Sequence, residues 1–453
     1  MKSFSVAAAL AAATTALAHP SPSPVELAER ATSSLPAITV KGNAFFSGDS
    51  RFYIRGVDYQ PGGSSDLVDP IADKATCSRD IAYFKELGIN TVRIYTVDNT
   101  ASHDECMALL AAAGIYLVLD VNTPLYSLNR AEPNASYNAV YLQNIFATID
   151  AFSGYSNTLA FFSGNEVIND DATTPAAPYV KAVTRDMRNY IKSMSYRQIP
   201  VGYSAADVDS NRKEMAEYMN CGSDEERSDF FAFNDYSWCD PSSFTTSGWD
   251  QKVKNFTGYG LPIFLSEYGC NTNTRKWEEV ASLYSEDMTP VYSGGLVYEY
   301  SQEESKYGLV TISGSTVTPL DDFTALQEAF KATSNPSGDG GYNSTGGASS
   351  CPAKSANWEV ANNDLPAIPS AAAALFKKGA GTGAGLTGKG SQNAGGTSTG
   401  TATSGSGSSS TSDTATTSSS KAAGASLQPP FSAAPLLVGA VTVALAMVGT
   451  TLL

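Results

Sequence analysis

The chain has 453 residues and a formal net charge of −16, which argues against nucleic acid or an anionic membrane surface as a binding partner. Its only two histidines are His19 and His103, so a Ser-His-Asp triad and a multi-histidine metal site are both nearly excluded. Acid-base chemistry would therefore fall to carboxylates or tyrosines, and we expect neither a metal nor a cofactor.

The N-terminus has the features of a secretory signal peptide over residues 1–18. Lys2 gives the positive start, an apolar run follows from Val6 to Leu17, and Ala16-Leu17-Ala18 is a small-x-small cleavage site. The apolar run is shorter than the roughly 20 residues that a membrane span needs. A buried N-terminal helix is the alternative, but the cleavage pattern favours a secreted protein.

Eight apolar, β-branched runs recur between residues 35 and 332, with helix-like stretches between them. The runs are Phe52 to Tyr59, Thr91 to Val97, Tyr116 to Val121, Leu159 to Ser163, Pro200 to Ser204, Phe230 to Tyr236, Pro262 to Ser266 and Gly295 to Tyr300. This alternation predicts an α/β fold, the (β/α)8 or TIM barrel. A doubly wound sheet is the alternative, but Gln60-Pro61-Gly62-Gly63 after the first run is not its phosphate-binding turn.

Polar side chains gather where the predicted strands end, which is where a (β/α)8 barrel carries its active site. Carboxylates and amides bind hydroxyl groups, and aromatic rings pack on pyranose faces, so this rim suits a sugar. The residues at these ends are Asp58, Tyr59, Gln60, Tyr95, Asp120, Asn122, Asn165, Glu166, Asp207, Asn234, Asp235, Tyr236, Glu267, Tyr268, Tyr298 and Glu299.

Two of these residues, Glu166 and Glu267, follow the fourth and seventh strands, so we expect their carboxyl groups to face one sugar across the rim. Retaining glycosidases hold two carboxyl groups about 5 to 5.5 Å apart; one protonates the leaving oxygen and the other attacks the anomeric carbon. A transglycosylase uses the same covalent intermediate, but a sugar hydroxyl resolves it. Asn165 is placed to bind the sugar 2-hydroxyl, and Tyr298 to donate a hydrogen bond to the nucleophile.

The chain beyond residue 332 has three predicted parts. Residues 333–378 form a short appendix packed on the barrel. Residues 379–425 are almost wholly Gly, Ser, Thr and Ala, which predicts a disordered stalk. Residues 426–453 are a polar spacer and an uncharged apolar tail, as in a glycosylphosphatidylinositol (GPI) signal that is removed, with Gly424 as the attachment residue. A transmembrane anchor is the alternative, but no basic residue follows the tail.

Cysteines and sequons also fit a secreted protein. Six cysteines predict three disulfides, although sequence alone leaves every pairing open. N-glycans are expected at the three Asn-x-Ser/Thr sequons, which begin at Asn134, Asn255 and Asn343.

Several motifs resemble the fungal GPI-anchored β-1,3-glucanosyltransferases of glycoside hydrolase family 72, which remodel the cell wall. They run over Tyr53 to Gln60, Thr91 to Tyr95, Asn129-Arg130, Phe162 to Val167, Val201 to Ser204, Leu265 to Cys270 and Gly295 to Tyr300. Some family members carry a cysteine-rich glucan-binding module after the barrel. Cys351 is the last cysteine here, so the chain resembles the shorter members.

The resemblance implies that Glu166 is the proton donor and Glu267 the nucleophile. It implies internal cleavage of β-1,3-glucan and transfer of the new reducing end to the non-reducing end of another glucan, by a monomer at the outer face of the plasma membrane or in the wall. It also implies the disulfides Cys77–Cys106, Cys221–Cys351 and Cys239–Cys270, and glucan contacts at Tyr95, Asn122, Asn129, Arg130, Asn165, Asp207, Arg212 and Tyr298.

Some roles stay open at this point. Gln60 is a further candidate for substrate contact, Asp120 either supports the nucleophile or is structural, and Tyr236 is either a sugar contact or rim packing. Asp207 and Arg212 form either part of the substrate site or only a surface ion pair, which contributes about 0 to 1 kcal/mol. A glucan hydrolase and a non-catalytic wall-binding protein are the alternatives to a transferase.

Overall fold

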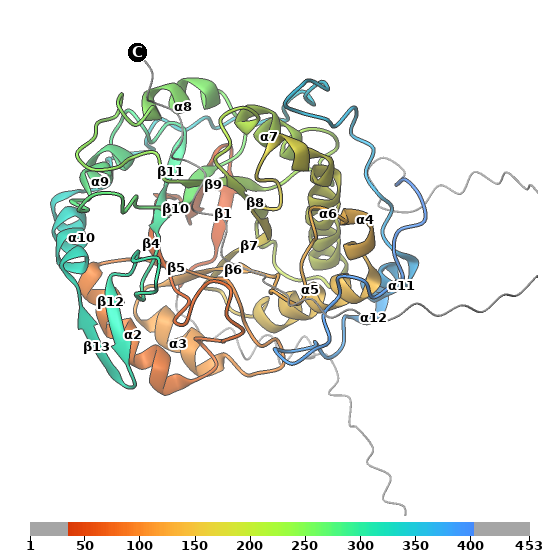
Figure 1. The fold of residues 1–453 in the computed structure, drawn as a ribbon, viewed down its shortest axis with the longest axis horizontal. Coiled ribbons are helices and arrows are strands. Elements are labelled where there is room, and N and C mark those ends of the chain that lie inside the picture. The colour runs from red at the N-terminus through yellow and green to blue at the C-terminus, as the bar shows by residue number, and fades with distance from the viewer. Residues whose placement is uncertain (1–34, 403–453) are drawn as a thin grey trace, which may run out of the picture. The chain divides into compact units, whose positions relative to one another are not determined.

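Eight parallel strands close into a barrel in the computed structural model, which describes residues 35–402 (Figure 1). Each strand pairs with the next along the chain, and β11 pairs with β4 to close the barrel. The predicted eight strands and the (β/α)8 fold are thus confirmed. The strands are β4 (Ile54–Asp58), β5 (Thr91–Ile94), β6 (Tyr116–Asp120), β7 (Thr158–Asn165), β8 (Val201–Ala206), β9 (Phe230–Asp235), β10 (Ile263–Tyr268) and β11 (Tyr292–Val297).

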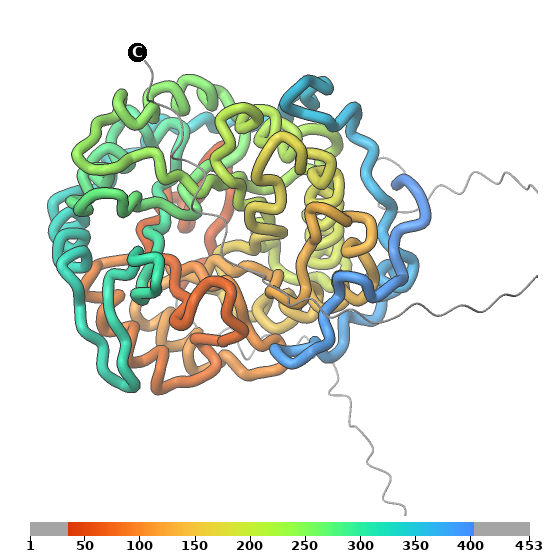
Figure 2. The backbone as a smooth tube through the Cα atoms, viewed as in Figure 1, coloured from red at the N-terminus to blue at the C-terminus, as the bar shows by residue number. Residues whose placement is uncertain are grey.

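Helices surround the barrel, as the ribbon and the backbone trace both show (Figures 1 and 2). None of the helices within residues 35–402 is long and apolar enough to cross a membrane. The main helices are α2 (Lys74–Leu87), α3 (Asp104–Ala112), α5 (Ala139–Phe152), α6 (Ala177–Ser193), α7 (Arg212–Met219), α8 (Trp249–Phe256), α9 (Glu278–Leu283) and α10 (Asp321–Ala332). Shorter helical turns are α4 (Pro133–Ser136), η1 (Asp171–Ala176), α11 (Ser370–Ala373) and α12 (Leu375–Lys378).

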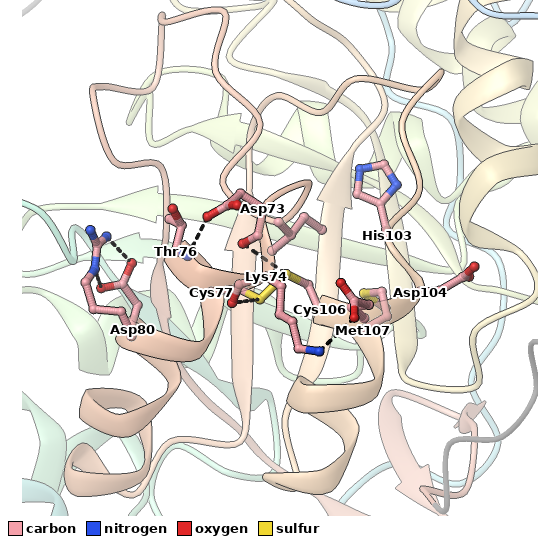
Figure 3. The surroundings of a disulfide bond; sticks show 12 residues. Asp73, Lys74, Thr76, Cys77, Asp80, His103, Asp104, Cys106 and Met107 are labelled. Carbon is pink, nitrogen blue, oxygen red and sulfur yellow. Dashed lines mark hydrogen bonds and ion pairs between the residues drawn. A yellow bond between two sulfur atoms is a disulfide. The ribbon is translucent and has the colours of Figure 1, made fainter. Parts of the chain in front are cut away.

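Local sequence signals explain where helix α2 begins and ends. Asp73 caps its start by accepting a hydrogen bond from the Thr76 backbone N–H at 2.7 Å, and Gly88 ends it in the left-handed conformation, with φ of 71°. A disulfide between Cys77 and Cys106 then ties α2 to α3 (Figure 3). The other two disulfides are Cys221–Cys351 and Cys239–Cys270, so all three pairings implied by the resemblance are present.

Two small antiparallel sheets were not expected from the sequence. β12 (Val310–Ser313) and β13 (Thr316–Pro319) form a hairpin, and three strands near the N-terminus form a separate sheet: β1 (Ile38–Lys41), β2 (Ala44–Ser47) and β3 (Ser50–Phe52). Phe45 of β2 packs against two rings inside the barrel, Phe230 and Phe264, with ring centroids 6.0 and 5.9 Å apart. Because Phe230 begins β9, the N-terminal sheet covers the amino end of the barrel.

The C-terminal appendix packs against the outside of the barrel. Trp358 is fully buried, and its ring lies 5.3 Å from that of Tyr218 on α7. Cys351 is bonded to Cys221 just after the same helix. Tyr218 is also fully buried, so the contact between appendix and barrel is part of the core.

The start of the stalk, predicted at residue 379, differs from the structure. Gln143 on α5 donates hydrogen bonds from its side chain to the backbone carbonyls of Ala380 and Thr382, at 3.0 and 2.8 Å. Further along, the Ala402 backbone N–H donates to the Leu365 carbonyl at 2.9 Å. Residues 379–402, which we name the strap, are therefore held on the barrel. Polar side chains bind the backbone of this segment, so it is ordered with few apolar side chains of its own.

Several predictions lie outside the described residues: the signal peptide at 1–18, the stalk beyond residue 402, the GPI signal at 426–453 and the attachment residue Gly424. Of the three sequons, Asn134 and Asn255 are exposed and Asn343 is half-buried. Glycosylation at these positions stays a prediction.

Replacing Trp358 tests the packing of the appendix. We expect Trp358→Ala to lower the free energy of unfolding by about 3 to 5 kcal/mol, because a large buried ring is lost and a cavity is left. The Tm should fall by several degrees, with a smaller fall for Trp358→Phe, which keeps a ring. A Tm for Trp358→Ala equal to that of the wild type would show that the appendix contributes nothing to the stability of the barrel.

Candidate active site

Glu166 lies one residue after β7 in an unusual backbone conformation. Its φ is +49°, in the left-handed region that residues other than glycine rarely adopt. Such a residue costs on the order of 1 to 3 kcal/mol and persists only where its surroundings impose it, often at functional sites. Here the Glu166 N–H donates to the Ser204 carbonyl at 2.9 Å, and Arg130 donates to the Glu166 carbonyl at 2.7 Å. The side chain is fixed as well, because Asn234 Nδ2 donates to Oε1 at 2.9 Å.

Glu267 lies within β10, and its carboxylate is almost completely buried. Its Oε1 accepts hydrogen bonds from the Tyr95 hydroxyl at 2.8 Å and from Arg93 Nη1 at 3.2 Å. Its Oε2 accepts one from the Tyr236 hydroxyl at 2.7 Å. Three donors, two from β5 and its end and one from the end of β9, thus fix the orientation of this carboxylate.

The two glutamates interact electrostatically. Burial raises the pKa of Glu267 to about 7, and the nearby carboxylate of Glu166 raises it too. The charge of Arg93 and the hydrogen bonds from Tyr236 and Tyr95 act in the opposite direction and favour the ionised form. The sequence predicts that the two carboxyl groups lie close together at one end of the barrel. The electrostatic effect of Glu166 on Glu267 agrees with this prediction.

Arg93 is a functional candidate to which the sequence reasoning assigned no role. Its guanidinium is fully buried on β5 and donates to Asp120 through Nε at 2.8 Å and Nη2 at 3.3 Å, besides its contact with Glu267. It also stacks on the rings of Tyr95 and Phe162, 4.2 and 4.6 Å from their centroids. The sequence signal was an arginine inside an otherwise apolar strand, Thr91-Val92-Arg93-Ile94.

Burial also acts on two further carboxyl groups that interact with Glu267, those of Asp58 and Glu299. Asp58 is fully buried at the end of β4, and neither of its side-chain oxygens has a hydrogen-bond partner among the described residues. Burial raises its pKa well above the usual value, and burial likewise raises the pKa of Glu299 to about 9. For both groups, burial therefore favours the neutral form over the charged form.

A polar network connects the strands that carry the two glutamates. Ser204 on β8 donates to Asn165 Oδ1 at 2.7 Å, and Asn234 Nδ2 also donates to this oxygen, at 3.1 Å. Ser266 on β10 donates to Asn234 Oδ1 at 2.8 Å. The carbonyl oxygen of Asn165 is thus occupied, which leaves its NH2 group available to a ligand such as a sugar hydroxyl.

A pocket of 290 Å³ lies beside the two glutamates at this end of the barrel. Neither glutamate lines the pocket. Two of the lining residues lie next to Glu166: Asn165 precedes it in the chain, and Arg130 donates to its backbone carbonyl. Five of the residues predicted to bind substrate are brought together here: Tyr95, Asp120, Asn122, Arg130 and Asn165. Within residues 35–402, no group of three or more His, Cys, Asp or Glu side chains is arranged to hold a metal ion.

The contacts of Tyr298 and Gln60 differ from the roles that the sequence predicts for these two residues. The hydroxyl of Tyr298 donates to Ser64 Oγ at 3.4 Å, and the phenolic donors to Glu267 are instead Tyr95 and Tyr236. Gln60 is buried, and both ends of its amide bind backbone groups: Nε2 donates to the Val68 carbonyl, and Oε1 accepts from the N–H groups of Tyr95 and the next residue. Gln60 therefore holds two loops together rather than facing a ligand.

The remaining predicted contacts lie at the edge of the site. Asp207 forms an ion pair with Arg212, and Lys252 Nζ bridges Asp207 and Asp235 at 2.6 Å each. None of these four charged side chains lines the pocket. Asn129 Oδ1 accepts a hydrogen bond from the Ala131 N–H, so its side chain stabilises a turn in its own loop.

Comparison with known proteins agrees with this arrangement. A family model described as Glucanosyltransferase, glycoside hydrolase family 72, matches residues 27–334. The 1,3-beta-glucanosyltransferase gel1 of Aspergillus fumigatus is 71% identical over 390 residues, which cover 86% of this chain and 85% of that protein. The 1,3-beta-glucanosyltransferase GAS5 of Saccharomyces cerevisiae is 56% identical over 366 residues, which cover 80% and 75%.

Solved structures extend the comparison to three dimensions. The Saccharomyces cerevisiae Gas2p structure in complex with laminaritriose and laminaritetraose matches with a TM-score of 0.69 and 40% identity, covering 74% of this chain and 78% of that one. The fold, the sequence and the extent of the match agree, and the chain therefore belongs to the glucanosyltransferases of glycoside hydrolase family 72.

Proposed function

We propose that this enzyme is a retaining β-1,3-glucanosyltransferase in which Glu267 is the nucleophile and Glu166 the general acid and base. One observation carries the assignment of roles. Glu267 accepts three hydrogen bonds, two from tyrosines and one from Arg93, which favour a carboxylate. Glu166 accepts a single hydrogen bond from a neutral amide at Oε1, a contact that suits a carboxyl group that must gain and lose a proton.

The reaction then runs in two displacements. The Glu267 carboxylate attacks the anomeric carbon of a glucan, the glycosidic C–O bond breaks, and Glu166 gives its proton to the leaving oxygen. A hydroxyl at the non-reducing end of a second glucan next gives its proton to Glu166 and attacks the same carbon, which releases Glu267. The net result is one β-1,3 linkage broken and one formed, with the anomeric configuration retained.

The substrate is proposed from the relatives. The gel1 and GAS5 proteins are named 1,3-beta-glucanosyltransferases, and the Gas2p structure contains laminari-oligosaccharides. We propose β-1,3-glucan as both donor and acceptor, with the NH2 group of Asn165 facing the 2-hydroxyl of the donor sugar. Secretion and a GPI anchor would place this monomeric enzyme beside the cell-wall glucan that it lengthens.

Product analysis tests the transferase activity. Incubation of the purified protein with a reduced β-1,3-glucan oligomer of defined length should give products longer than the starting oligomer, because a sugar hydroxyl resolves the intermediate. Chromatographic separation by length is the measurement. Products that are all shorter than the donor would identify a hydrolase instead.

Isosteric replacement of each glutamate tests the site. Glu267→Gln should abolish both cleavage and transfer, because no covalent intermediate forms. Glu166→Gln should lower kcat by about 10²- to 10⁴-fold, the usual contribution of general acid-base catalysis. Glu225→Gln, on the exposed surface, is the matched control. Wild-type turnover in Glu267→Gln would remove the assignment.

The acidic limb of the pH profile should report the ionisation of Glu267. The rate requires the carboxylate, so kcat/KM should fall as the pH drops below the pKa of this group. Tyr236→Phe removes a hydrogen bond that lowers the pKa of Glu267, so the pKa rises and the limb should move to higher pH, by about one unit.

Tyr83→Phe is the control for this shift, because its hydroxyl donates to the carbonyl of Val317, away from the site, at 3.1 Å. Its pH profile should match that of the wild type. An acidic limb that stays in place in Tyr236→Phe would show that Glu267 is not the ionising group.

A further inference from the structure

One wall of the active-site pocket belongs to the loop of residues 122–130. This loop contributes six of the lining residues: Asn122, Thr123, Pro124, Ser127, Leu128 and Arg130. At the far end of the loop, Arg130 donates to the backbone carbonyl of Glu166 at 2.7 Å. The position of the loop therefore affects the shape of the pocket.

The strap contacts this loop directly. The Ser391 N–H donates to the Leu125 carbonyl at 3.0 Å. Gln392 Nε2 donates to the Ser127 carbonyl at 2.8 Å and lies 3.3 Å from the Ser127 hydroxyl oxygen. Two backbone carbonyls in the middle of the 122–130 loop are thus bound by two consecutive residues that lie more than 250 positions later in the chain.

The fit between strap and loop is close. Tyr126, between the two bound carbonyls, is buried, and a Cβ atom at Gly388 would lie 2.1 Å from its hydroxyl oxygen. No side chain fits at that distance, so glycine allows the strap backbone to pass beside Tyr126. The glycine-rich composition that predicts disorder here serves close packing instead.

The strap is also fixed to the barrel at the same point. Asn138 is fully buried, and its Nδ2 donates to the Ser391 carbonyl at 2.6 Å while its Oδ1 caps α5 by accepting from the Tyr141 N–H. The Ala139 N–H donates to the Gly396 carbonyl at 3.1 Å. Ser391 thus connects the rigid start of α5 to the loop, and Figure 1 shows the blue C-terminal segment passing along this side of the barrel.

We propose that Ser391 and Gln392 are positioning residues for glucan: they hold the 122–130 loop in the conformation that binds the sugar chain. The inference deepens the proposed function and rests on it. These two residues lie outside the segment matched by the family model, residues 27–334, so neither that match nor the proposed chemistry of the two glutamates assigns them a role.

Substitutions at Gln392 in the full-length enzyme test the proposal. Gln392→Ala removes the donor, and Gln392→Glu keeps the shape of the side chain but sets a carboxylate oxygen against the Ser127 carbonyl. Each should raise KM for a β-1,3-glucan oligomer about three- to tenfold, as expected for the loss of one positioning hydrogen bond, and leave kcat within about twofold. The neighbour Asn393, whose side chain is exposed, supplies the control Asn393→Ala.

Hydrogen exchange without glucan provides a second readout. Backbone amides of residues 122–130 should exchange faster in both Gln392 variants than in the wild type or in Asn393→Ala. Unchanged KM values, unchanged loop exchange, or an equal effect of Asn393→Ala would each overturn the proposal. If instead the proposed function is wrong, the wild-type protein will lengthen no glucan. The hydrogen exchange of residues 122–130 will still depend on Gln392 in that case.

Discussion

The buried guanidinium of Arg93 is the interaction on which the rest of the site depends. It lies inside the barrel between Asp120 and Glu267 and contacts both. Two carboxylates removed from water would be strongly destabilising without a cation, and removing one partner of a buried ion pair typically costs about 3 to 5 kcal/mol. Its stacking on Tyr95 and Phe162 fixes the plane of the guanidinium, so the same contact that compensates charge also orients the proposed nucleophile.

The charge of Arg93 opposes the effect of burial on the carboxyl groups around it. Burial raises the pKa of Asp58 well above its usual value and raises that of Asp120 as well, while the charge of Arg93 lowers both. On the other side of the site, Glu166 depends on an amide and on a strained backbone rather than on a cation. The two carboxyl groups therefore have different surroundings: Glu267 contacts a cation and two phenols, and Glu166 contacts an amide.

Much of this architecture is readable from the sequence for a physical reason. Strands of a parallel barrel are buried on both faces, so they appear as continuous apolar runs such as Leu159 to Ser163. Chemistry-bearing residues lie where such runs end, which is how Glu166 and Glu267 were found. The short strands of the N-terminal sheet, β1 to β3, lack that pattern, and they were missed.

The sequence does not show in which direction a side chain points. Tyr298 and Gln60 lie at the predicted strand ends, yet their polar atoms bind Ser64 and backbone groups instead of facing Glu267 or a ligand. Arg93 was overlooked because a charge inside a strand has no periodic signal. The strap was predicted as disordered because its order comes from polar side chains elsewhere, such as Asn138 and Gln143, that bind its backbone.

Direct observation of the covalent intermediate would test the central role of Glu267. In Glu166→Gln, a β-1,3-glucan oligosaccharide with fluoride at its anomeric carbon can still react, since fluoride leaves without a proton from residue 166. The second step lacks its base and should stall. We predict that mass spectrometry of the quenched, proteolysed protein will find the oligosaccharide as an ester on the peptide that contains Glu267. An adduct on another carboxylate, or inverted product with no adduct, would contradict this assignment.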